Sequence, residues 1–420
     1  MQCDDQADVV IVGAGQAAAE LALALRSEGF AGTVLVIGDE SSLPYQRPPL
    51  SKAYLSGKVS QEALLVRPQA AYERANVRFL LDSLVVSTDR LGKCLSLADG
   101  RRVTYQQLAL ATGGRARRLS VPGSDLRRIH SIRSLTDVDA LRNEFLARRR
   151  LVIVGGGYVG LEVAAVAIEV GLQVTVLESA PRVLARVTAP AVSAFYEALH
   201  REHGVEILTG VEVQGFEAGE CPVHVGAALC KDGRRIPADL VIVGVGLEPN
   251  VGLAQEAGLA TDNGILIDEY GRTSDPDIVA LGDCANHPCA FYGRRMRLES
   301  VPSAIEQART AAATLCAKRK KAESLPWFWS DQYGLKLQMA GLAQGYERMV
   351  LRGSFSARSF AAFYLIGDRL IAADVVGRPA DFMQAKRLIT ERVPVSDAQL
   401  LDESLPLKDI LAPARIGIGQ

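Results

Sequence analysis

The sequence lacks the features that mark several large classes of protein. It has seven cysteines in 420 residues, and none stands in a CxxC pair or at a metal-type spacing: they are Cys3, Cys94, Cys221, Cys230, Cys284, Cys289 and Cys316. Thiols scattered in this way predict no disulfide framework, no zinc site and no other metal centre. No run approaches the roughly 18 uninterrupted apolar residues of a membrane span, so no such span is expected.

An excess of charge of one sign is also lacking. The chain carries 47 Lys and Arg against 48 Asp and Glu, a formal net charge of −1. A partner attracted by charge must therefore meet a local patch, and nucleic acid is not expected as the main ligand. The first residues, MQCDDQAD, are acidic where a secretory signal would be basic. We therefore expect a cytoplasmic protein, with two or three domains at this length.

A phosphate-binding pattern stands near the start of the chain. The apolar, largely β-branched run Val9–Val12 predicts a parallel strand covered on both faces. The turn after it reads Gly13, Ala14, Gly15, Gln16, Ala17 and Ala18. In this fingerprint the first glycine permits a tight turn, the second lets backbone approach a pyrophosphate, and the small last residue lets helix and strand pack closely. The phosphates would lie on the amides of a helix N-terminus.

The rest of this unit follows in order. A helix is expected from about Ala17 to Arg26, then a strand from Thr33 to Ile37. Asp39 and Glu40 come directly after that strand, where a carboxylate can bond ribose hydroxyls. The first pattern is therefore a complete strand, turn, helix, strand and acid.

The same pattern recurs later. The strand Leu151–Val154 leads into a turn that reads Gly155, Gly156, Gly157, Tyr158, Val159 and Gly160. A helix ending near Gly171 and a strand over Gln173–Leu177 follow, and Glu178 stands 18 residues (178 − 160) after the last glycine. That is close to the spacing of the ribose-binding acid, and a carboxylate there repels a 2′-phosphate. The sequence favours NAD over NADP, although Arg182 moderates this.

One such fingerprint alone is weak evidence, because glycine turns between strand and helix also occur for packing reasons. A duplicated α/β scaffold without cofactors is the alternative. Two complete units favour two bound dinucleotides, one delivering hydride and the other, a flavin, accepting it.

Further apolar runs predict strands that lead the chain back to the two glycine fingerprints. Leu108–Gly113 ends in Thr112 and Gly113, and Leu240–Gly246 ends in a glycine-rich turn at Gly246. Ile278–Leu281 ends at Gly282 and Asp283, so the first domain is completed after the second. We expect a discontinuous FAD-binding domain over 1–115 and 247–325 and an NAD-binding domain over 116–246.

The remaining residues, 326–420, predict a C-terminal α+β domain. Short alternating runs indicate antiparallel strands, and Gly367, Asp368 and Arg369 read as a hairpin turn. The expected strands and helices are 336–341, 348–353, 360–366, 370–376, 380–390 and 407–411. The fold class is thus α/β, with two Rossmann-like domains of the glutathione-reductase type and an antiparallel C-terminal sheet.

Several motifs resemble one family, the FAD-containing, NADH-dependent ferredoxin reductases of bacterial oxygenase systems. They include PPLSKAYLSGK at 48–58, LALATGGR at 108–115, VTAPAVSAFYE at 187–197, GDCA at 282–285, ESVPSAIEQAR at 299–309 and PWFWSDQY at 326–333. The resemblance runs from Val9 to about Leu411. It implies FAD contacts at Gly13, Gly15, Ala17, Ala18, Asp39, Arg47, Lys52, Val85, Thr112, Arg133, Asp283, Val301 and Trp329, and NAD contacts at Gly155, Gly157, Gly160, Glu178 and Gly246.

Three residues are given catalytic roles by the resemblance. It implies that Lys52 stabilises the anionic reduced flavin, that Glu162 faces the nicotinamide, which then lies between these two side chains, and that Trp329 packs on the flavin. The residues alone also allow a solvated lysine at Lys52, a dipole-stabilising acid in a first helical turn at Glu162, and a core tryptophan. For Asp283, implied to bond the ribityl chain, the alternative is a helix cap.

The sequence also lacks the cysteine pair through which related enzymes pass electrons on from the flavin. Related dithiol enzymes carry a CxxxxC early in the FAD domain, where this chain has Tyr45 to Lys52 and no thiol. The resemblance implies single-electron transfer to an acidic [2Fe-2S] ferredoxin that supplies a cytochrome P450 or another oxygenase. Such a partner needs a basic docking patch, for which Arg309, Lys386, Arg387 and Lys408 are the candidates. We expect a monomer. A rubredoxin reductase and a signalling protein resembling apoptosis-inducing factor remain alternatives.

Overall fold

The computed structural model describes residues 5–411, and Cys3 lies outside this range. The chain forms two compact units, each assembled from separate stretches. The first unit consists of the chain up to Arg47, Ser60–Arg115 and Leu247–Ser324. The second consists of Pro48–Val59, Ala116–Gly246 and the chain from Leu325 onward.

The first unit is built on one mixed sheet with the strand order β3-β2-β1-β6-β5-β4, and β18 adds to β6. The strands are β1 (Asp5–Val12), β2 (Val34–Ile37), β3 (Val77–Leu80), β4 (Val85–Asp89), β5 (Cys94–Leu97), β6 (Arg102–Leu110) and β18 (Ile278–Ala280). Strand β1 pairs in parallel with both β2 and β6, and β18 pairs in parallel with β6. Val9–Val12 is buried throughout, as a strand covered on both faces should be.

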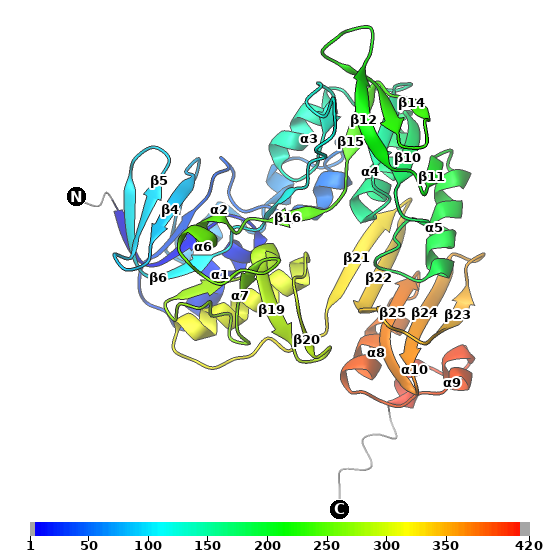
Figure 1. Ribbon diagram of the computed structural model, residues 1–420. Helices are drawn as coiled ribbons and strands as arrows, with labels where there is room; N and C mark the ends of the chain where they lie inside the picture. The colour runs from blue at the N-terminus through cyan, green and yellow to red at the C-terminus, as the bar shows by residue number, and fades with distance from the viewer. Residues whose placement is uncertain (1–4, 412–420) are drawn as a thin grey trace, which may run out of the picture. The chain divides into compact units, whose positions relative to one another are not determined.

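Helices cover this sheet. On one face α1 (Gln16–Ser27) packs against α7 (Val301–Leu315), and together with β1 they form one apolar core. Figure 1 shows this juxtaposition of an early and a late segment. The second core lies among β5, β6 and the short α6 (Gly252–Glu256). The smaller elements are η1 (Pro48–Ser51), which belongs to the second unit, η2 (Glu62–Leu64), α2 (Gln69–Arg74), β7 (Gly114–Ala116), β16 (Leu247–Pro249), β17 (Ile265–Leu266), η3 (Gly282–Cys284), β19 (Ala285–Cys289) and β20 (Arg294–Met296).

The second unit contains a five-stranded parallel sheet in the order β11-β10-β9-β15-β8. Its strands are β8 (Ile129–His130), β9 (Arg150–Val154), β10 (Gln173–Glu178), β11 (Glu206–Thr209) and β15 (Leu240–Val243). The helices of this part are α3 (Leu135–Arg142), α4 (Tyr158–Val170) and α5 (Pro190–Glu202). A three-stranded antiparallel sheet of β12 (Val213–Ala218), β13 (Val225–Cys230) and β14 (Arg235–Pro237) is added, which the sequence analysis did not predict.

The same unit contains a five-stranded antiparallel sheet in the order β21-β22-β25-β24-β23. Its strands are β21 (Trp327–Gln332), β22 (Leu335–Gly341), β23 (Arg348–Ser354), β24 (Ser359–Ile366) and β25 (Arg369–Val376), followed by α8 (Pro379–Thr390), α9 (Asp397–Leu401) and α10 (Leu407–Ile410). Two Rossmann-like sheets and an antiparallel C-terminal sheet confirm the expected fold class. The strand β21 was missed, because its aromatic run was interpreted only as a flavin contact.

Candidate functional site

The first glycine turn has the geometry of a dinucleotide fingerprint. Gly13 has φ +103°, and a Cβ there would lie 2.3 Å from the carbonyl oxygen of Ala111, directly after β6. This position therefore requires glycine, both for its backbone angle and for the close approach of the returning strand. At Gly15, by contrast, an added Cβ would meet nothing within 4 Å. The backbone at the start of α1 consequently faces open space.

The second turn repeats this geometry. Gly155 has φ +111°, and its Cβ would lie 2.4 Å from the carbonyl oxygen of Gly244, directly after β15. At Gly157 an added Cβ would meet nothing within 4 Å. The Cβ of a residue at Gly160 would lie 2.1 Å from the carbonyl oxygen of Gly155, so the last glycine is needed for helix–strand packing.

The helix N-termini behind the two turns can receive phosphate. The N-cap residues are Gly15 for α1 and Gly157 for α4, and neither helix has a side-chain cap. The first amides of each helix thus keep hydrogen-bonding capacity for a ligand, next to backbone without a Cβ. The residues present fit a dinucleotide at each turn.

The acids that follow the two patterns differ in their surroundings. Asp39 is exposed just after β2, whereas its neighbour Glu40 pairs with Arg47 at 2.7 Å and accepts a bond from the Tyr45 hydroxyl. Glu178 accepts hydrogen bonds from the amides of Gly156 and Ala180, both at 2.7 Å. The Glu178 carboxylate is therefore held at the glycine turn.

Arg182, the residue that moderates the preference for NAD, is already engaged. Its guanidinium donates to the hydroxyl of Ser193 and to the carbonyl oxygen of Ala185. A guanidinium held in this way is less available for a 2′-phosphate.

Four more of the predicted FAD contacts belong to the first unit, and they are Asp283, Thr112, Val85 and Val301. A Cβ at Gly282 would stand 3.0 Å from the Cβ of Ala17, which brings the neighbouring Asp283 to the start of α1. The interpretation of Asp283 as a helix cap is wrong, because Asp283 lies inside the 3₁₀ turn Gly282–Cys284, a strand follows that turn, and Ser300 caps α7. Thr112 donates its hydroxyl to the carbonyl oxygen of Asn250 at 2.7 Å.

Val85 and Val301 complete that set. Val85 is a core residue of β4 with 6% of its surface exposed, so a contact from it with FAD would have to use its backbone. Val301 is the half-buried first residue of α7. The other three predicted FAD contacts, Lys52, Arg133 and Trp329, belong to the second unit. Arg133 directly precedes the Ser134 cap of α3, and its amide donates to Asp137 at 2.9 Å.

Lys52 and Glu162 form an ion pair inside the second unit. The Lys52 Nζ lies 2.7 Å from the Glu162 Oε2, with side-chain exposures of 19% and 4%. The interpretations of Lys52 as a solvated lysine and of Glu162 as a first-turn acid are therefore wrong, since Glu162 lies in the second turn of α4. The two side chains contact each other directly.

Two hydroxyl groups that the sequence analysis missed also bind this carboxylate. Ser51 donates to Oε2 of Glu162 and Ser330 donates to Oε1, both at 2.6 Å. Ser51 belongs to the PPLSK motif and could have been found beside Lys52. Ser330 could not be found without recognising β21 as a strand that contacts α4.

Trp329 lies on the opposite face of β21 from Ser330, as alternation along a strand requires. It is half-buried beside Trp327, with ring centroids 5.6 Å apart. The Nζ of Lys386 on α8 lies 4.9 Å from the centroid of Trp327, and burial lowers the pKa of this lysine. Lys386 therefore combines a positive charge with an aromatic contact.

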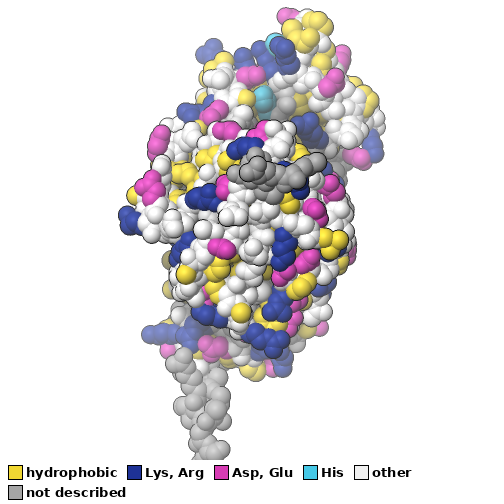
Figure 2. All heavy atoms as spheres, turned by 90° about the vertical axis from the view of Figure 1, so that its left-hand side faces the viewer, with side chains coloured by type: hydrophobic (Ala, Val, Ile, Leu, Met, Phe, Trp, Pro, Cys, Tyr) yellow, Lys and Arg dark blue, Asp and Glu magenta, His cyan; other side chains and the backbone are white. Residues whose placement is uncertain are grey.

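The other predicted docking residues are on the surface. Arg309 is exposed on α7 of the first unit, and Lys408 is exposed on α10, which contacts α8 in the second unit. Arg387 pairs with Glu391 at 3.2 Å along α8. Basic and acidic side chains are interspersed over the face drawn in Figure 2, in agreement with the balanced composition.

Residues 5–411 contain six of the seven cysteines. The six cysteines in this range are all free, and Cys284 and Cys289 are both buried. No three His, Cys, Asp or Glu side chains in the same range gather closely enough to hold a metal ion. Within that range, no helix combines the length and the apolar character that crossing a bilayer requires.

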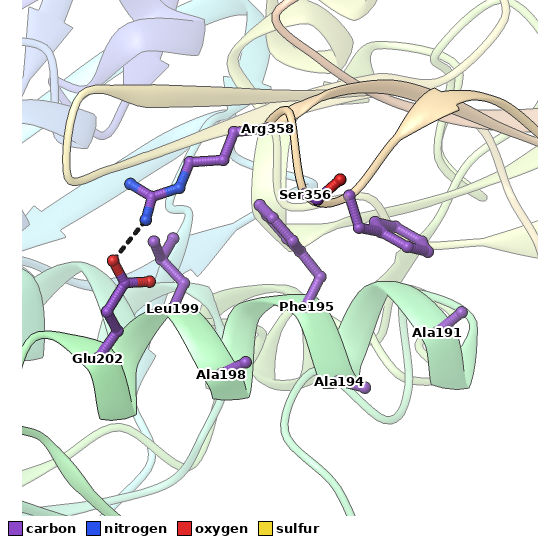
Figure 3. Close-up of a pocket in the computed structure, with 9 residues that line it drawn as sticks. Ala191, Ala194, Phe195, Ala198, Leu199, Glu202, Ser356 and Arg358 are labelled. Carbon is purple, nitrogen blue, oxygen red and sulfur yellow. Dashed lines mark hydrogen bonds and ion pairs between the residues drawn. The ribbon is translucent and has the colours of Figure 1, made fainter.

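An apolar hollow of about 510 Å³ lies between α5 and the loop that joins β23 to β24. Phe195 and Leu199 point from α5 toward this loop, and Arg358 pairs with Glu202 at one end, 2.6 Å apart (Figure 3). None of the predicted site residues lines it. The hollow is therefore separate from the fingerprints and from Glu162.

Two family models together match most of the chain. Residues 7–308 match the family model described as pyridine nucleotide-disulphide oxidoreductase, and residues 327–411 match one described as reductase C-terminal. Putidaredoxin reductase of Pseudomonas putida is 50% identical over 97% of both chains. Rhodocoxin reductase of Rhodococcus erythropolis is 40% identical over 96% of this chain and 94% of its own.

A solved structure is similar over the same length. The crystal structure of the covalent putidaredoxin reductase–putidaredoxin complex matches with a TM-score of 0.94 and 50% identity, over 99% of this chain and 100% of that chain. The expected relation to ferredoxin reductases of bacterial oxygenase systems is confirmed. The chain belongs to the pyridine nucleotide-disulphide oxidoreductase family, as a flavoprotein oxidoreductase that uses FAD and NAD(P)H.

Proposed function

We propose that this protein is an NADH-dependent ferredoxin reductase, which passes electrons from NADH through FAD, one at a time, to a [2Fe-2S] ferredoxin. The observation that carries the proposal is the pair of fingerprints, each with a required first glycine and an open second one. When bound, FAD supplies the conversion between a two-electron donor and a one-electron acceptor. The similarity to putidaredoxin reductase and rhodocoxin reductase over nearly the whole chain supports the same assignment.

The chain's own residues would bind and orient the two nucleotides. The amides at the start of α1, with Asp39 and Asp283, would hold FAD, and those at the start of α4, with Glu178, would hold NADH. The engaged Arg182 and the carboxylate of Glu178 favour NADH over NADPH. In the second unit, Lys52 and Glu162 would provide a fixed pair of charges for the reaction.

The absence of a dithiol favours a protein acceptor over a disulfide. The positions where dithiol enzymes carry their cysteine pair are Tyr45 to Lys52 here, and Lys52 is occupied with Glu162. An acidic ferredoxin would be received by Lys386 and Lys408 on adjacent helices of the second unit, and Arg309 is a separate candidate on the first unit. We further propose that this ferredoxin supplies a cytochrome P450 or a similar oxygenase, and that the protein is a cytoplasmic monomer.

The decisive experiment mixes the FAD-loaded protein with NADH and cytochrome c, alone and with purified [2Fe-2S] ferredoxins or rubredoxin. We expect cytochrome c reduction to depend on a [2Fe-2S] ferredoxin and to weaken as salt is raised, because charges guide the docking. Reduction that needs no ferredoxin, or that proceeds only with rubredoxin, contradicts the proposal.

A further inference from the structure

A chain of hydrogen bonds leads away from Glu162 through the interior of the second unit. Ser330 donates to Glu162 at 2.6 Å, and the Ser330 oxygen accepts from the Gln332 amide nitrogen at 3.1 Å. The Gln332 amide oxygen lies 2.8 Å from His200 Nε2, and His200 Nδ1 lies 3.0 Å from the Tyr333 hydroxyl. Glu162, Ser330, Gln332 and His200 are all at most 3% exposed. None of the links beyond Ser330 belongs to a predicted site.

The direction of every link can be deduced. Burial lowers the pKa of His200 to about 4, so the ring is neutral at neutral pH and has one donor and one acceptor nitrogen. The Gln332 oxygen can only accept, so His200 Nε2 carries the hydrogen and Nδ1 accepts from the Tyr333 hydroxyl. The Gln332 nitrogen can only donate, so it fixes the Ser330 oxygen as its acceptor. All hydrogens therefore point toward Glu162.

The backbone holds this chain in place. Ser330 and Gln332 are two residues apart on β21 and share the face that contacts α4. The hairpin that follows has φ +50° at Tyr333 and +73° at Gly334, as a two-residue turn between antiparallel strands requires. Tyr333 adopts this uncommon conformation while its ring stacks on His203, with centroids 3.8 Å apart.

Few other ionisable groups face this chain. Near Glu162 they are Lys52 and, on its own helix, Tyr158. Near the far end they are His203 on α5, Tyr333 itself and Glu169 on α4. Among residues 5–411, only Lys52 forms an ion pair with this carboxylate, so the uncharged donors must provide the rest of its hydrogen bonding.

We propose that Ser330, Gln332 and His200 are positioning residues that hold the Glu162 carboxylate in one orientation against Lys52. The inference rests on the proposed function, in which this ion pair takes part. Hydrogen bonds that all point in one direction polarise and strengthen one another. The last link of this chain offers Glu162 a hydrogen-bond donor, which is what a carboxylate needs. The Gln332 amide does not readily pass a proton on, so the chain orients the carboxylate instead of conducting protons.

The test uses the infrared carboxylate bands of Glu162 in the FAD-loaded protein, identified by subtracting the spectrum of Glu162→Gln. We expect Ser330→Ala to shift these bands most, Gln332→Met less and His200→Phe least. The kcat for NADH oxidation should fall about tenfold in Ser330→Ala and about threefold in Gln332→Met, with little change in KM, because a hydrogen bond to a charged group is lost. Ser330→Thr keeps the hydroxyl and should restore both readouts.

A matched control removes a buried hydroxyl from a different buried carboxylate in the same unit. Thr188 donates to Asp374, and Thr188→Val should leave the Glu162 bands unchanged. Unchanged bands in Ser330→Ala and Gln332→Met, in protein that melts at the parent temperature, would overturn the inference. The infrared readout needs no acceptor protein, so shifted bands in a protein that fails to reduce ferredoxin count against the proposed function alone.

Discussion

The two fingerprints share their backbone but not their chemistry. In each, a Cβ on the first glycine would overlap the carbonyl of the returning strand, and the second glycine stands open at a helix N-terminus. In each, a glutamate follows the open glycine by five residues: Glu20 in α1 follows Gly15, and Glu162 in α4 follows Gly157. The repeated pattern thus places equivalent carboxylates on both helices.

The surroundings of these two carboxylates differ. Glu20 lies 3.4 Å from Arg67, whose side chain is 47% exposed, and it accepts a bond from Gln16. Glu162 lies 2.7 Å from Lys52, whose side chain is 19% exposed, and two serine hydroxyls also bind it. The local motif therefore fixes where the carboxylate stands, while segments distant in sequence decide what it does.

The largest expected difference between the two fingerprints lies at their last small residue, which is Ala18 in the first and Gly160 in the second. Gly160→Ala would place a Cβ 2.1 Å from the carbonyl oxygen of Gly155, so the helix must move away from its strand. We expect a loss of about 3 kcal/mol in the free energy of unfolding, from overpacking against backbone that cannot yield. The equivalent Ala18→Gly should cost only about 1 kcal/mol, from helix propensity. Thermal and urea unfolding measure both, and equal losses would refute the packing argument.

The next largest difference concerns the two ion pairs. Lys52→Met leaves Glu162 buried without its counter-charge, so we expect kcat to fall about a hundredfold and the free energy of unfolding to fall by about 3 kcal/mol. Arg67→Met removes the partner of Glu20, and we expect changes below about 1 kcal/mol and twofold in kcat. Stopped-flow reduction of the flavin by NADH measures the first effect. Comparable kcat values for the two variants would exclude a special role for Lys52.

The sequence alone is sufficient to predict the turns, because the glycine spacing, the strand composition and the following acid are all local. The family resemblance adds Lys52 and Glu162 as candidate catalytic residues, together with the relation to ferredoxin reductases. It does not predict that they touch, because Lys52 precedes the second fingerprint by about a hundred residues. Ser330 was missed for a different reason. Aromatic residues hide the alternation of β21, and the partner helix is far away in sequence.

A third comparison, between Gly15 and Gly157, distinguishes the FAD site from the NADH site. Gly15→Ala and Gly157→Ala add a methyl group where the structure has open space, so both variants should fold normally. Because the methyl group obstructs the approach of a pyrophosphate to the backbone, we expect Gly15→Ala to lose about tenfold in FAD affinity. Gly157→Ala should retain FAD and raise the KM for NADH about tenfold. Flavin absorbance after gel filtration and steady-state kinetics distinguish the two, and a loss of FAD in Gly157→Ala would contradict the assignment of the sites.

The smallest effect is expected at the acids that follow the fingerprints. The Glu178 carboxylate binds the amides of Gly156 and Ala180, so Glu178→Gln removes the negative charge and one acceptor oxygen from the turn. We expect the preference for NADH over NADPH, as a ratio of kcat/KM values, to fall about fivefold, because repulsion of a 2′-phosphate is lost. Asp39→Asn is the matched change in the first copy and should leave that ratio unchanged.

Arg182 limits how far the preference for NADH falls in Glu178→Gln. Its guanidinium is held by Ser193 and by the Ala185 carbonyl oxygen, so it is less available for a 2′-phosphate. Ser193→Ala removes one of these acceptors and should let the guanidinium turn toward a phosphate. We therefore expect Ser193→Ala combined with Glu178→Gln to lower the nucleotide preference about threefold further than Glu178→Gln alone. An additional effect of Ser193→Ala that persists after Arg182→Ala would show that the serine acts on the nucleotide by another route.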